Sequence, residues 1–297
     1  MQIIPFWGCM ISLKYPHMEK AIRYSMEKLG VELVNETRFS CCPDPIYFKA
    51  EERLKWLTVA ARNISLAEEK GLDIITMCSG CTSTLCEANY TLKNNSGLKK
   101  EINKRLKKID REYKGTVSVR HLVTLIRDDV KMEKIADTVK FPLAGLKVAI
   151  HYGCHLLKPS EIMNVDDPII PSILADLLEI TGVVPVNHKE YLLCCGKACL
   201  DQELTFNMSH NVFQSVADSG ADCLGLICPT CFDSFDIGQL RINRKFKKDF
   251  QIPTLYYFQL LALAQGASLE EIGIHYHKIM PESFLEKIKK TKMAATS

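Results

Sequence analysis

Ten of the thirteen cysteines form two sets of five with nearly the same spacing. The first set is Cys9, Cys41, Cys42, Cys78 and Cys81, and the second is Cys154, Cys194, Cys195, Cys228 and Cys231. Each set contains a lone cysteine, an adjacent pair and a C-x-x-C motif, in that order. Because thiolates bind zinc and iron–sulfur clusters and also act as redox dithiols, the sets predict metal or redox chemistry that occurs twice.

Three kinds of thiol site compete for this pattern. A tetrahedral zinc site uses four ligands, so five cysteines with an adjacent pair fit it poorly, although zinc in one half stays open. A redox dithiol needs two cysteines and leaves three in each half unexplained. An iron–sulfur cluster can use the whole set, yet neither half has the compact C-x2-C-x2-C-x3-C-P run of ferredoxins. Cys86, Cys199 and Cys223 lie outside the pattern, and we expect them to be buried structural thiols.

The elements that must position these cysteines also occur twice. An aromatic-Gly-Cys unit ends an apolar run at Trp7-Gly8-Cys9 and again at Tyr152-Gly153-Cys154. In the first half, short apolar runs alternate with longer helical patterns. The expected strands are 3–7, 31–35, 72–77 and 117–119, and the expected helices are 17–29, 49–70 and 98–109.

This alternation predicts an α/β fold made of two pseudo-symmetric repeats of Rossmann-like βαβ units with parallel sheets. The cysteine loops should lie at the carboxyl ends of the strands, where such sheets form their sites. Pro142 and Gly145 punctuate the chain near 141–146. We therefore expect a first repeat at 1–144 and a second at 145–297, each with one cluster.

Composition excludes several classes of protein. With 47% hydrophobic and 25% charged residues the chain falls in the ordinary globular range, and its formal charge of +3 is too small to indicate nucleic-acid binding. The amino terminus lacks the pattern of an export signal, and no apolar run is long enough to span a bilayer, so we expect a cytoplasmic protein. The basic runs at 99–108 and 287–292 are typical of solvated helix faces, and docking of a partner protein is the functional alternative.

The duplicated pattern C-x(31–39)-C-C-x(32–35)-C-x-x-C resembles the cysteine-rich CCG domain pair found in the B subunit of soluble CoB–CoM heterodisulfide reductase. The resemblance covers nearly the whole chain. It implies that each set of five cysteines holds one noncubane [4Fe-4S] cluster and that the heterodisulfide CoM-S-S-CoB binds between the two clusters. One departure is that Cys41-Cys42 is followed by Pro43, whereas Cys194-Cys195 is followed by Gly196.

The resemblance also implies an activity and partners. It implies reduction of CoM-S-S-CoB to CoM-SH and CoB-SH in methanogenesis, with two clusters matching the two sulfurs of the substrate. Electrons would come from a ferredoxin-like iron–sulfur subunit and a flavin-containing subunit of the reductase, and ultimately from a hydrogenase or formate dehydrogenase. Because the same domain occurs in other complexes, a noncatalytic electron-transfer or assembly role is the alternative.

Reducing a disulfide needs protons, and these substrates carry anionic groups. Histidine titrates near neutral pH, so His155, directly after Cys154, is our first candidate for the proton donor, ahead of His188 and His151. The sulfonate, carboxylate and phosphate groups of the two coenzymes call for cations. The candidate substrate-binding residues are Lys197, Lys158 and Lys189.

Overall fold

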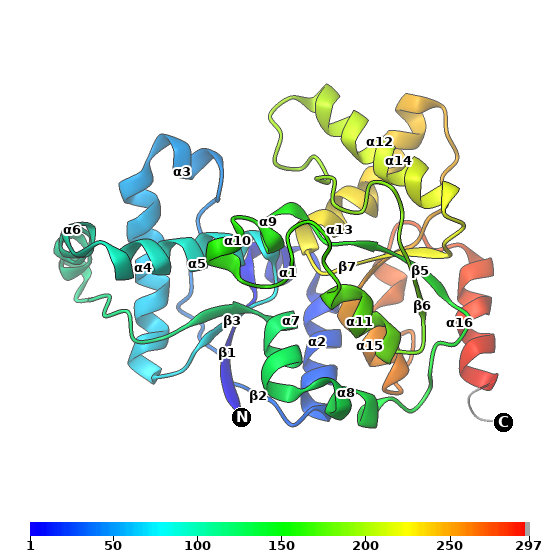
Figure 1. The fold of residues 1–297 in the computed structure, drawn as a ribbon, viewed down its shortest axis with the longest axis horizontal. Helices are drawn as coiled ribbons and strands as arrows, with labels where there is room; N and C mark the ends of the chain where they lie inside the picture. The colour runs from blue at the N-terminus through cyan, green and yellow to red at the C-terminus, as the bar shows by residue number, and fades with distance from the viewer. Residues whose placement is uncertain (295–297) are drawn as a thin grey trace.

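Two four-stranded parallel sheets form the framework of the molecule in the computed structural model, which describes residues 1–294 (Figure 1). The first sheet has the order β2-β1-β3-β4 and the second has the order β6-β5-β7-β8. The strands are β1 (Gln2–Phe6), β2 (Glu32–Leu33), β3 (Ile74–Thr76), β4 (Val119–His121), β5 (Lys147–His151), β6 (Val184–Val186), β7 (Cys223–Leu226) and β8 (Thr254–Tyr256). The expected α/β fold with two repeats is therefore confirmed.

Helices connect the strands within each half. In the first half they are α1 (Gly8–Leu13), α2 (Pro16–Lys28), α3 (Tyr47–Glu51), α4 (Arg53–Lys70), α5 (Ser79–Asn94), α6 (Ser96–Leu106) and η1 (Lys107–Ile109). Between the sheets run α7 (Leu122–Leu125), η2 (Ile126–Val130) and α8 (Met132–Thr138). The second half adds α9 (Cys154–Leu157), α10 (Ser160–Met163), α11 (Ile173–Ile180), α12 (Gln202–Asp218), α13 (Pro229–Phe235), α14 (Ile237–Phe246), α15 (Tyr257–Ala264), η3 (Ile274–Tyr276) and α16 (Glu282–Ala294).

The predicted elements of the first half are present, with shifted bounds. The strand expected at 31–35 shrinks to two residues, and the helix expected at 49–70 is divided into α3 and α4 at Glu52. Helix α5, which starts inside the first C-x-x-C motif, was not predicted from the sequence. Its polar and small residues hide the periodicity, because residues 79–89 are packed between α4 and β4 and are buried on nearly all sides.

The strand order sets where a site can form. In each sheet the second strand lies on one side of the first strand, and the third strand lies on its other side. This makes the carboxyl ends of β1 and β3, and of β5 and β7, topological switch points. Cys9 and Cys78 follow the first pair, and Cys154 and Cys228 follow the second. The fold thus brings sequence-distant thiols to one sheet edge in each half.

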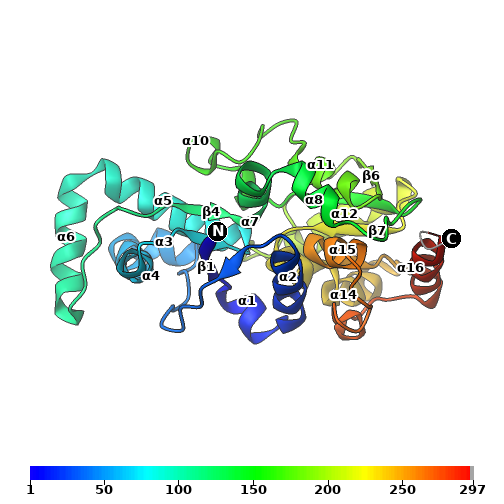
Figure 2. The same ribbon diagram turned by 90° about the horizontal axis from the view of Figure 1, so that it is seen from below.

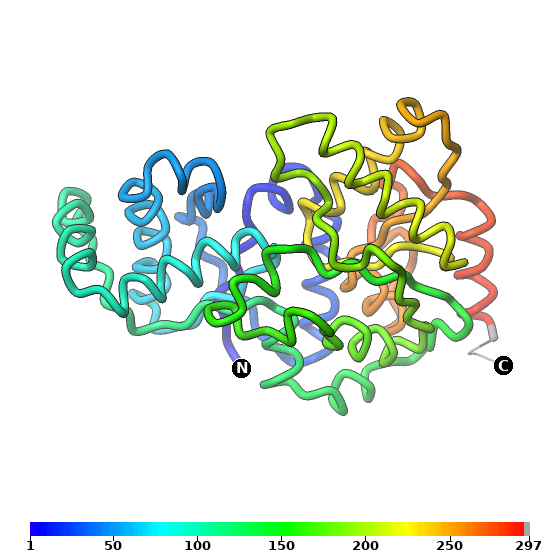
Figure 3. Tube along the Cα trace, turned by 45° about the horizontal axis from the view of Figure 1, so that its top comes forward, coloured from blue at the N-terminus to red at the C-terminus, as the bar shows by residue number. Residues whose placement is uncertain are grey.

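The two halves pack closely against each other. Helix α2 of the first half lies along α15 of the second, as Figure 2 shows from below. The hydroxyl of Tyr256, at the end of β8, donates a hydrogen bond of 2.8 Å to the carbonyl oxygen of Met77. Figure 3 shows the backbone of both halves, and residues 139–146 connect α8 of the first half to β5 of the second. The expected division into 1–144 and 145–297 lies in this connection and stays a prediction, and 295–297 are outside the described residues.

Candidate metal centre

All ten cysteines of the two sets line one cavity of about 250 Å³ between the halves. The first half contributes loops after β1, β2 and β3, and the second half contributes the matching loops after β5, β6 and β7. The apolar part of the cavity wall is formed by Trp7, Met10, Ile46 and Ala198, and Thr230 contributes a hydroxyl group. The predicted convergence of each set is therefore a feature of the structure, and the two sets share one space.

The C-x-x-C motifs form the innermost part of the cavity. Cys78 and Cys228 each precede the first residue of a helix, α5 and α13, and their sulfur atoms lie 4.0 Å apart across the two halves. Cys81 and Cys231 lie one turn further on. Unpaired backbone N–H groups at a helix start favour negative charge, so both motifs are placed where thiolates are stabilised.

The thiols are too crowded to ionise independently. Hydrogen bonds from Cys41 and Cys81 lower the pKa of Cys42 to about 6, whereas the bond to Cys42 raises the pKa of Cys81. In the second half Cys154 donates to the sulfur of Cys194 at 3.7 Å, which raises the pKa of Cys154 and lowers that of Cys194. Ten thiolates in this space require compensating positive charge, which metal ions supply.

Two equivalent glycines let the backbone approach these thiols closely. Gly8 and Gly153 both have positive φ, +68° and +75°, which residues with a side chain rarely adopt. A Cβ atom on Gly8 would lie 2.8 Å from the sulfur of Cys81, and one on Gly153 would lie 3.4 Å from the sulfur of Cys231. The repeated aromatic-Gly-Cys unit therefore keeps space free around the second cysteine of each C-x-x-C motif.

The donor set fits iron–sulfur clusters. Soft sulfur ligands in two groups of five surround a shared cavity, and backbone glycines leave room beside them. Within residues 1–294 no three or more His, Cys, Asp or Glu side chains are arranged as ligands of a single metal ion. All thirteen cysteines are free thiols.

Comparison with known families decides the relationship. The model of the cysteine-rich CCG domain matches this chain twice, at residues 3–86 and 148–236. The chain belongs to the CCG family. Each match contains one complete set of five cysteines, so the internal repeat is a duplicated CCG domain.

Curated relatives cover nearly the whole of this CCG protein. It is 40% identical over 287 residues to the B subunit of the ferredoxin/F(420)H(2)-dependent CoB-CoM heterodisulfide reductase of Methanosarcina acetivorans, with 95% of each chain covered. It is 37% identical to the B subunit of the ferredoxin:CoB-CoM heterodisulfide reductase of Methanosarcina mazei, again with 95% of each covered. The membrane anchor subunit of the 8-methylmenaquinol:fumarate reductase of Wolinella succinogenes is 30% identical, with 92% of this chain and 95% of the relative covered. All three relatives are named as subunits of oxidoreductase complexes.

A solved structure shares the fold. A hypothetical protein from Helicobacter pylori superposes with a TM-score of 0.77 at 18% identity, covering 94% of this chain and 52% of that one. In residues 1–294 of the CCG protein, none of the helices combines the length and apolar character needed to cross a membrane.

The histidine and lysine candidates divide between the cavity and its surroundings. His155 and Lys197 line the cavity, and Nδ1 of His155 lies 3.3 Å from the hydroxyl of Ser83 on α5. Lys158 and Lys189 are exposed and are not among the lining residues. His188 is buried, and both of its ring nitrogens are taken up by the hydroxyl of Ser215 and the carbonyl oxygen of Ile150.

An ionic group beside the cavity was not predicted from the sequence. Asp233, two residues after Cys231, is 2% exposed and pairs with both Lys14 and Lys197, and the hydroxyl of Tyr15 donates to it at 2.5 Å. Burial alone would raise the pKa of Asp233, but the bonds from these three side chains outweigh it and lower the pKa to about 2. Because Lys14 and Tyr15 come from the other half, only the fold reveals this group.

A small pocket continues from this group. It holds about 110 Å³ and is lined by Lys14, Lys197, Asp233 and Arg241, among others. Since Lys197 lines both this pocket and the cysteine cavity, the two spaces adjoin. Three cations face one carboxylate here, so the pocket favours an anion.

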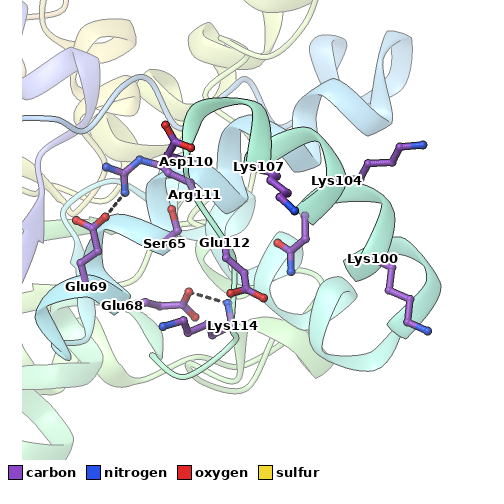
Figure 4. A pocket seen from close by; sticks show the side chains of 11 residues that line it. Ser65, Glu68, Glu69, Lys100, Lys104, Lys107, Asp110, Arg111, Glu112 and Lys114 are labelled. Atoms are coloured by element: carbon purple, nitrogen blue, oxygen red, sulfur yellow. Dashed lines mark hydrogen bonds and ion pairs between the residues drawn. The ribbon is translucent and has the colours of Figure 1, made fainter.

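Other expected features lie apart from the cysteine cavity. Cys223 is buried in β7 as expected, whereas Cys86 and Cys199 are only half-buried. The thiol of Cys86 donates to the carbonyl oxygen of Val119, and Cys199 contacts Met208. The basic run at 99–108 borders a hollow of about 820 Å³ at the far end of the first half. Figure 4 shows Lys100 and Lys104 pointing outward, while Arg111 pairs with Glu69 in the wall of the hollow. Acidic and basic side chains are mixed there, as on a solvated face.

Proposed function

We propose that this chain is the catalytic iron–sulfur subunit of a heterodisulfide reductase, which reduces CoM-S-S-CoB to CoM-SH and CoB-SH in methanogenesis. The observation that carries the proposal is the single cavity lined by both sets of five cysteines. Two relatives that cover 95% of this chain are named as the B subunit of such a reductase.

The proposal assigns one noncubane [4Fe-4S] cluster to each half. Cys9, Cys41, Cys42, Cys78 and Cys81 would hold the first, and Cys154, Cys194, Cys195, Cys228 and Cys231 would hold the second. When bound, the clusters supply single electrons and Lewis-acidic iron for sulfur. Five cysteines per site and the symmetric approach of the two halves support this assignment over a single zinc ion in each half.

The remaining lining residues would handle protons and anions. The reaction breaks one S–S bond, takes up two electrons and two protons, and forms two S–H bonds. His155 is the imidazole on the cavity wall, so we assign it to proton delivery. Lys197, with Lys14 and Arg241 in the adjoining pocket, would hold an anionic end of the substrate. The proposal favours Lys197 over Lys158 and Lys189, because those two are not among the lining residues.

Electrons must come from other proteins of the complex. We propose a ferredoxin-like iron–sulfur subunit and a flavin-containing subunit of the reductase as partners, with a hydrogenase or formate dehydrogenase as possible ultimate donors. A cytoplasmic location is part of the proposal, since thirteen free thiols suit a reducing compartment.

A second function is supported by one relative. The Wolinella protein, 30% identical over nearly the full length, is named as part of a fumarate reductase. The alternative is therefore a noncatalytic electron-transfer or assembly subunit of another oxidoreductase complex, using the same clusters without a disulfide substrate.

The test begins with iron and acid-labile sulfide in anaerobically prepared protein, followed by EPR of the oxidised sample with and without CoM-SH. About eight irons per chain and a signal that requires the thiol support two substrate-binding clusters. Eight irons with no response to the thiol favour the noncatalytic alternative. Stoichiometric zinc without iron contradicts both cluster proposals.

Matched variants test the residue assignments. We expect His155→Gln to lower kcat at least tenfold, and Lys197→Gln to raise KM for the heterodisulfide with a smaller effect on kcat. Lys189→Gln makes the same change of charge outside the cavity and serves as the control. An equal rise in KM for both lysine variants would show that Lys197 has no special role in binding.

A further inference from the structure

Two buried histidines lie at strand ends close to the second cysteine set, and the proposed mechanism uses neither of them. His151 is the last residue of β5, three residues before Cys154, and is 1% exposed. Within the described part of the chain neither of its ring nitrogens has a hydrogen-bond partner. A buried imidazole without a partner is costly, so its surroundings indicate what it is meant to contact.

The register of the second sheet places His151 close to the second cysteine set, because His151 of β5 pairs with Leu226 of β7, two residues before Cys228. Burial lowers the pKa of His151 to about 4, and His188 lowers it as well. The thiols of Cys228 and Cys194 raise this pKa. The ring of Phe235 closes another side, edge to face at 4.8 Å. His188 already uses both of its nitrogens elsewhere. His151 is therefore a neutral imidazole with an N–H group and with sulfur nearby.

His121 at the end of β4 is placed in a similar way. It is fully buried, and its Nδ1 accepts a hydrogen bond of 3.2 Å from the backbone N–H of Val123. This bond leaves the hydrogen on Nε2, which faces the backbone of Ile227, next to Cys228. Burial lowers the pKa of His121 to about 4, although the thiol of Cys228 and the hydrogen bond to the backbone of Ile227 act in the opposite direction. The N–H group of His121 is therefore directed to the backbone of Ile227, as the hydroxyl of Tyr256 is to that of Met77.

The first cysteine set lacks a donor at the position equivalent to His151. Phe6 ends β1 as His151 ends β5, each two residues before the glycine of the aromatic-Gly-Cys unit. Tyr256 ends β8 as His121 ends β4, and its hydroxyl is committed to the carbonyl oxygen of Met77. The two sets of thiols therefore have unequal hydrogen-bonding surroundings.

We propose that His151 donates an N–H hydrogen bond to a sulfur atom of the second cluster and makes this cluster easier to reduce than the first. This inference rests on the proposed clusters. Reduction adds one negative charge to a cluster, and an N–H donor near sulfur stabilises that charge and raises the reduction potential. His151 acts on the cluster as a tuning residue and does not take part in the chemical step.

The test is an EPR-monitored redox titration of the full chain, isolated with its clusters, in which the two repeats exchange residues. We expect His151→Phe, which installs the residue of the first repeat, to lower the reduction equilibrium constant of one cluster about tenfold, ~59 mV for one electron. Phe6→His should raise the constant of the other cluster. His151→Gln keeps an N–H donor and should restore much of the wild-type potential.

Iron content and spectra separate the outcomes. Unchanged reduction potentials in His151→Phe protein that retains its iron would overturn the inference. Equal shifts of the reduction potential in the Phe and Gln variants would also overturn it. Neither result would contradict the proposed clusters. If the His151→Phe protein does not retain iron, the Phe6→His variant provides the test. An unchanged reduction potential of the first cluster in Phe6→His would then overturn the inference. Electron spin echo spectra of 15N-histidine protein should show nitrogen coupling to the second cluster. Absence of iron from the unsubstituted chain would instead contradict the proposed function.

Discussion

The two cysteine sets are alike where they face each other and different where they face outward. Cys42, Cys78 and Cys81 are buried, as are their counterparts Cys195, Cys228 and Cys231. The outer thiols differ, because Cys9 and Cys41 are exposed whereas Cys154 and Cys194 are half-buried. Cys9 and Cys41 also line an outer groove of about 600 Å³, which includes Arg23 stacked on Trp7.

This difference separates what the duplicated motif must preserve from what each copy can change. The shared inner edge requires the same C-x-x-C geometry in both halves, since Cys78 and Cys228 nearly touch. The outer edge is free to diverge, and there Pro43 follows the first cysteine pair whereas Gly196 follows the second. A Cβ atom on Gly196 would lie 2.8 Å from the carbonyl oxygen of Thr205, so the second loop is closed down onto α12.

The largest effect is expected from a matched pair of glycine substitutions. Gly8→Ala and Gly153→Ala both place a side chain at a positive φ that residues with a side chain rarely adopt, at a cost of ~1–3 kcal/mol each. Gly8→Ala adds a 2.8 Å contact with Cys81, whereas Gly153→Ala adds a contact of 3.4 Å with Cys231. We expect Gly8→Ala to lose about half of the bound iron, and Gly153→Ala to retain most of it. Iron per chain and Tm measure the difference, and equal losses would show that the two inner edges are equally tight.

The next effect concerns the ionic group that joins the halves. Asp233→Asn removes the charge that Lys14 and Lys197 share, and we expect the free energy of unfolding to fall by about 2 kcal/mol. Glu203→Gln breaks the exposed pair with Lys245 within the second half and should cost less than about 0.5 kcal/mol. Chemical denaturation at pH 7 measures both, and equal losses would contradict the bridging role of Asp233.

The same group gives a pH signature with a definite sign. The pKa of Asp233 is about 2 in the folded protein and near its ordinary 3.8 in the unfolded chain. Its stabilising contribution is therefore complete above pH ~4 and is lost as the pH falls toward 2. Asp233→Asn should show a shallower loss of stability than the wild type over this interval. Parallel curves for the two proteins would show that Asp233 is not the source.

Most of the fold and the composition of the thiol site could be predicted from the sequence. Two sets of five cysteines, each following an apolar run, were sufficient to place loops at the carboxyl ends of parallel strands. The ionic group could not be predicted in this way, because Lys14 and Asp233 are 219 residues apart and meet only when the halves pack. Helix α5 was missed because its N-terminal part, 79–89, is buried on nearly all sides, which leaves no amphipathic pattern there. Lys158 and Lys189 were chosen for proximity in sequence to the motifs, which does not determine side-chain position.

The smallest effect sharpens the comparison at the last strand of each sheet. The hydroxyl of Tyr256 reaches the carbonyl oxygen of Met77 in the other half, and His121 has the equivalent place on β4. Tyr256→Phe leaves that carbonyl unpaired and should cost about 1 kcal/mol, or ~2 °C in Tm. Tyr90→Phe, at an exposed position on α5, makes the same chemical change and should leave Tm unaltered. Equal Tm values for both variants would mean that this bond adds nothing to the contact between the repeats, and that van der Waals packing of α2 on α15 supplies the stability there.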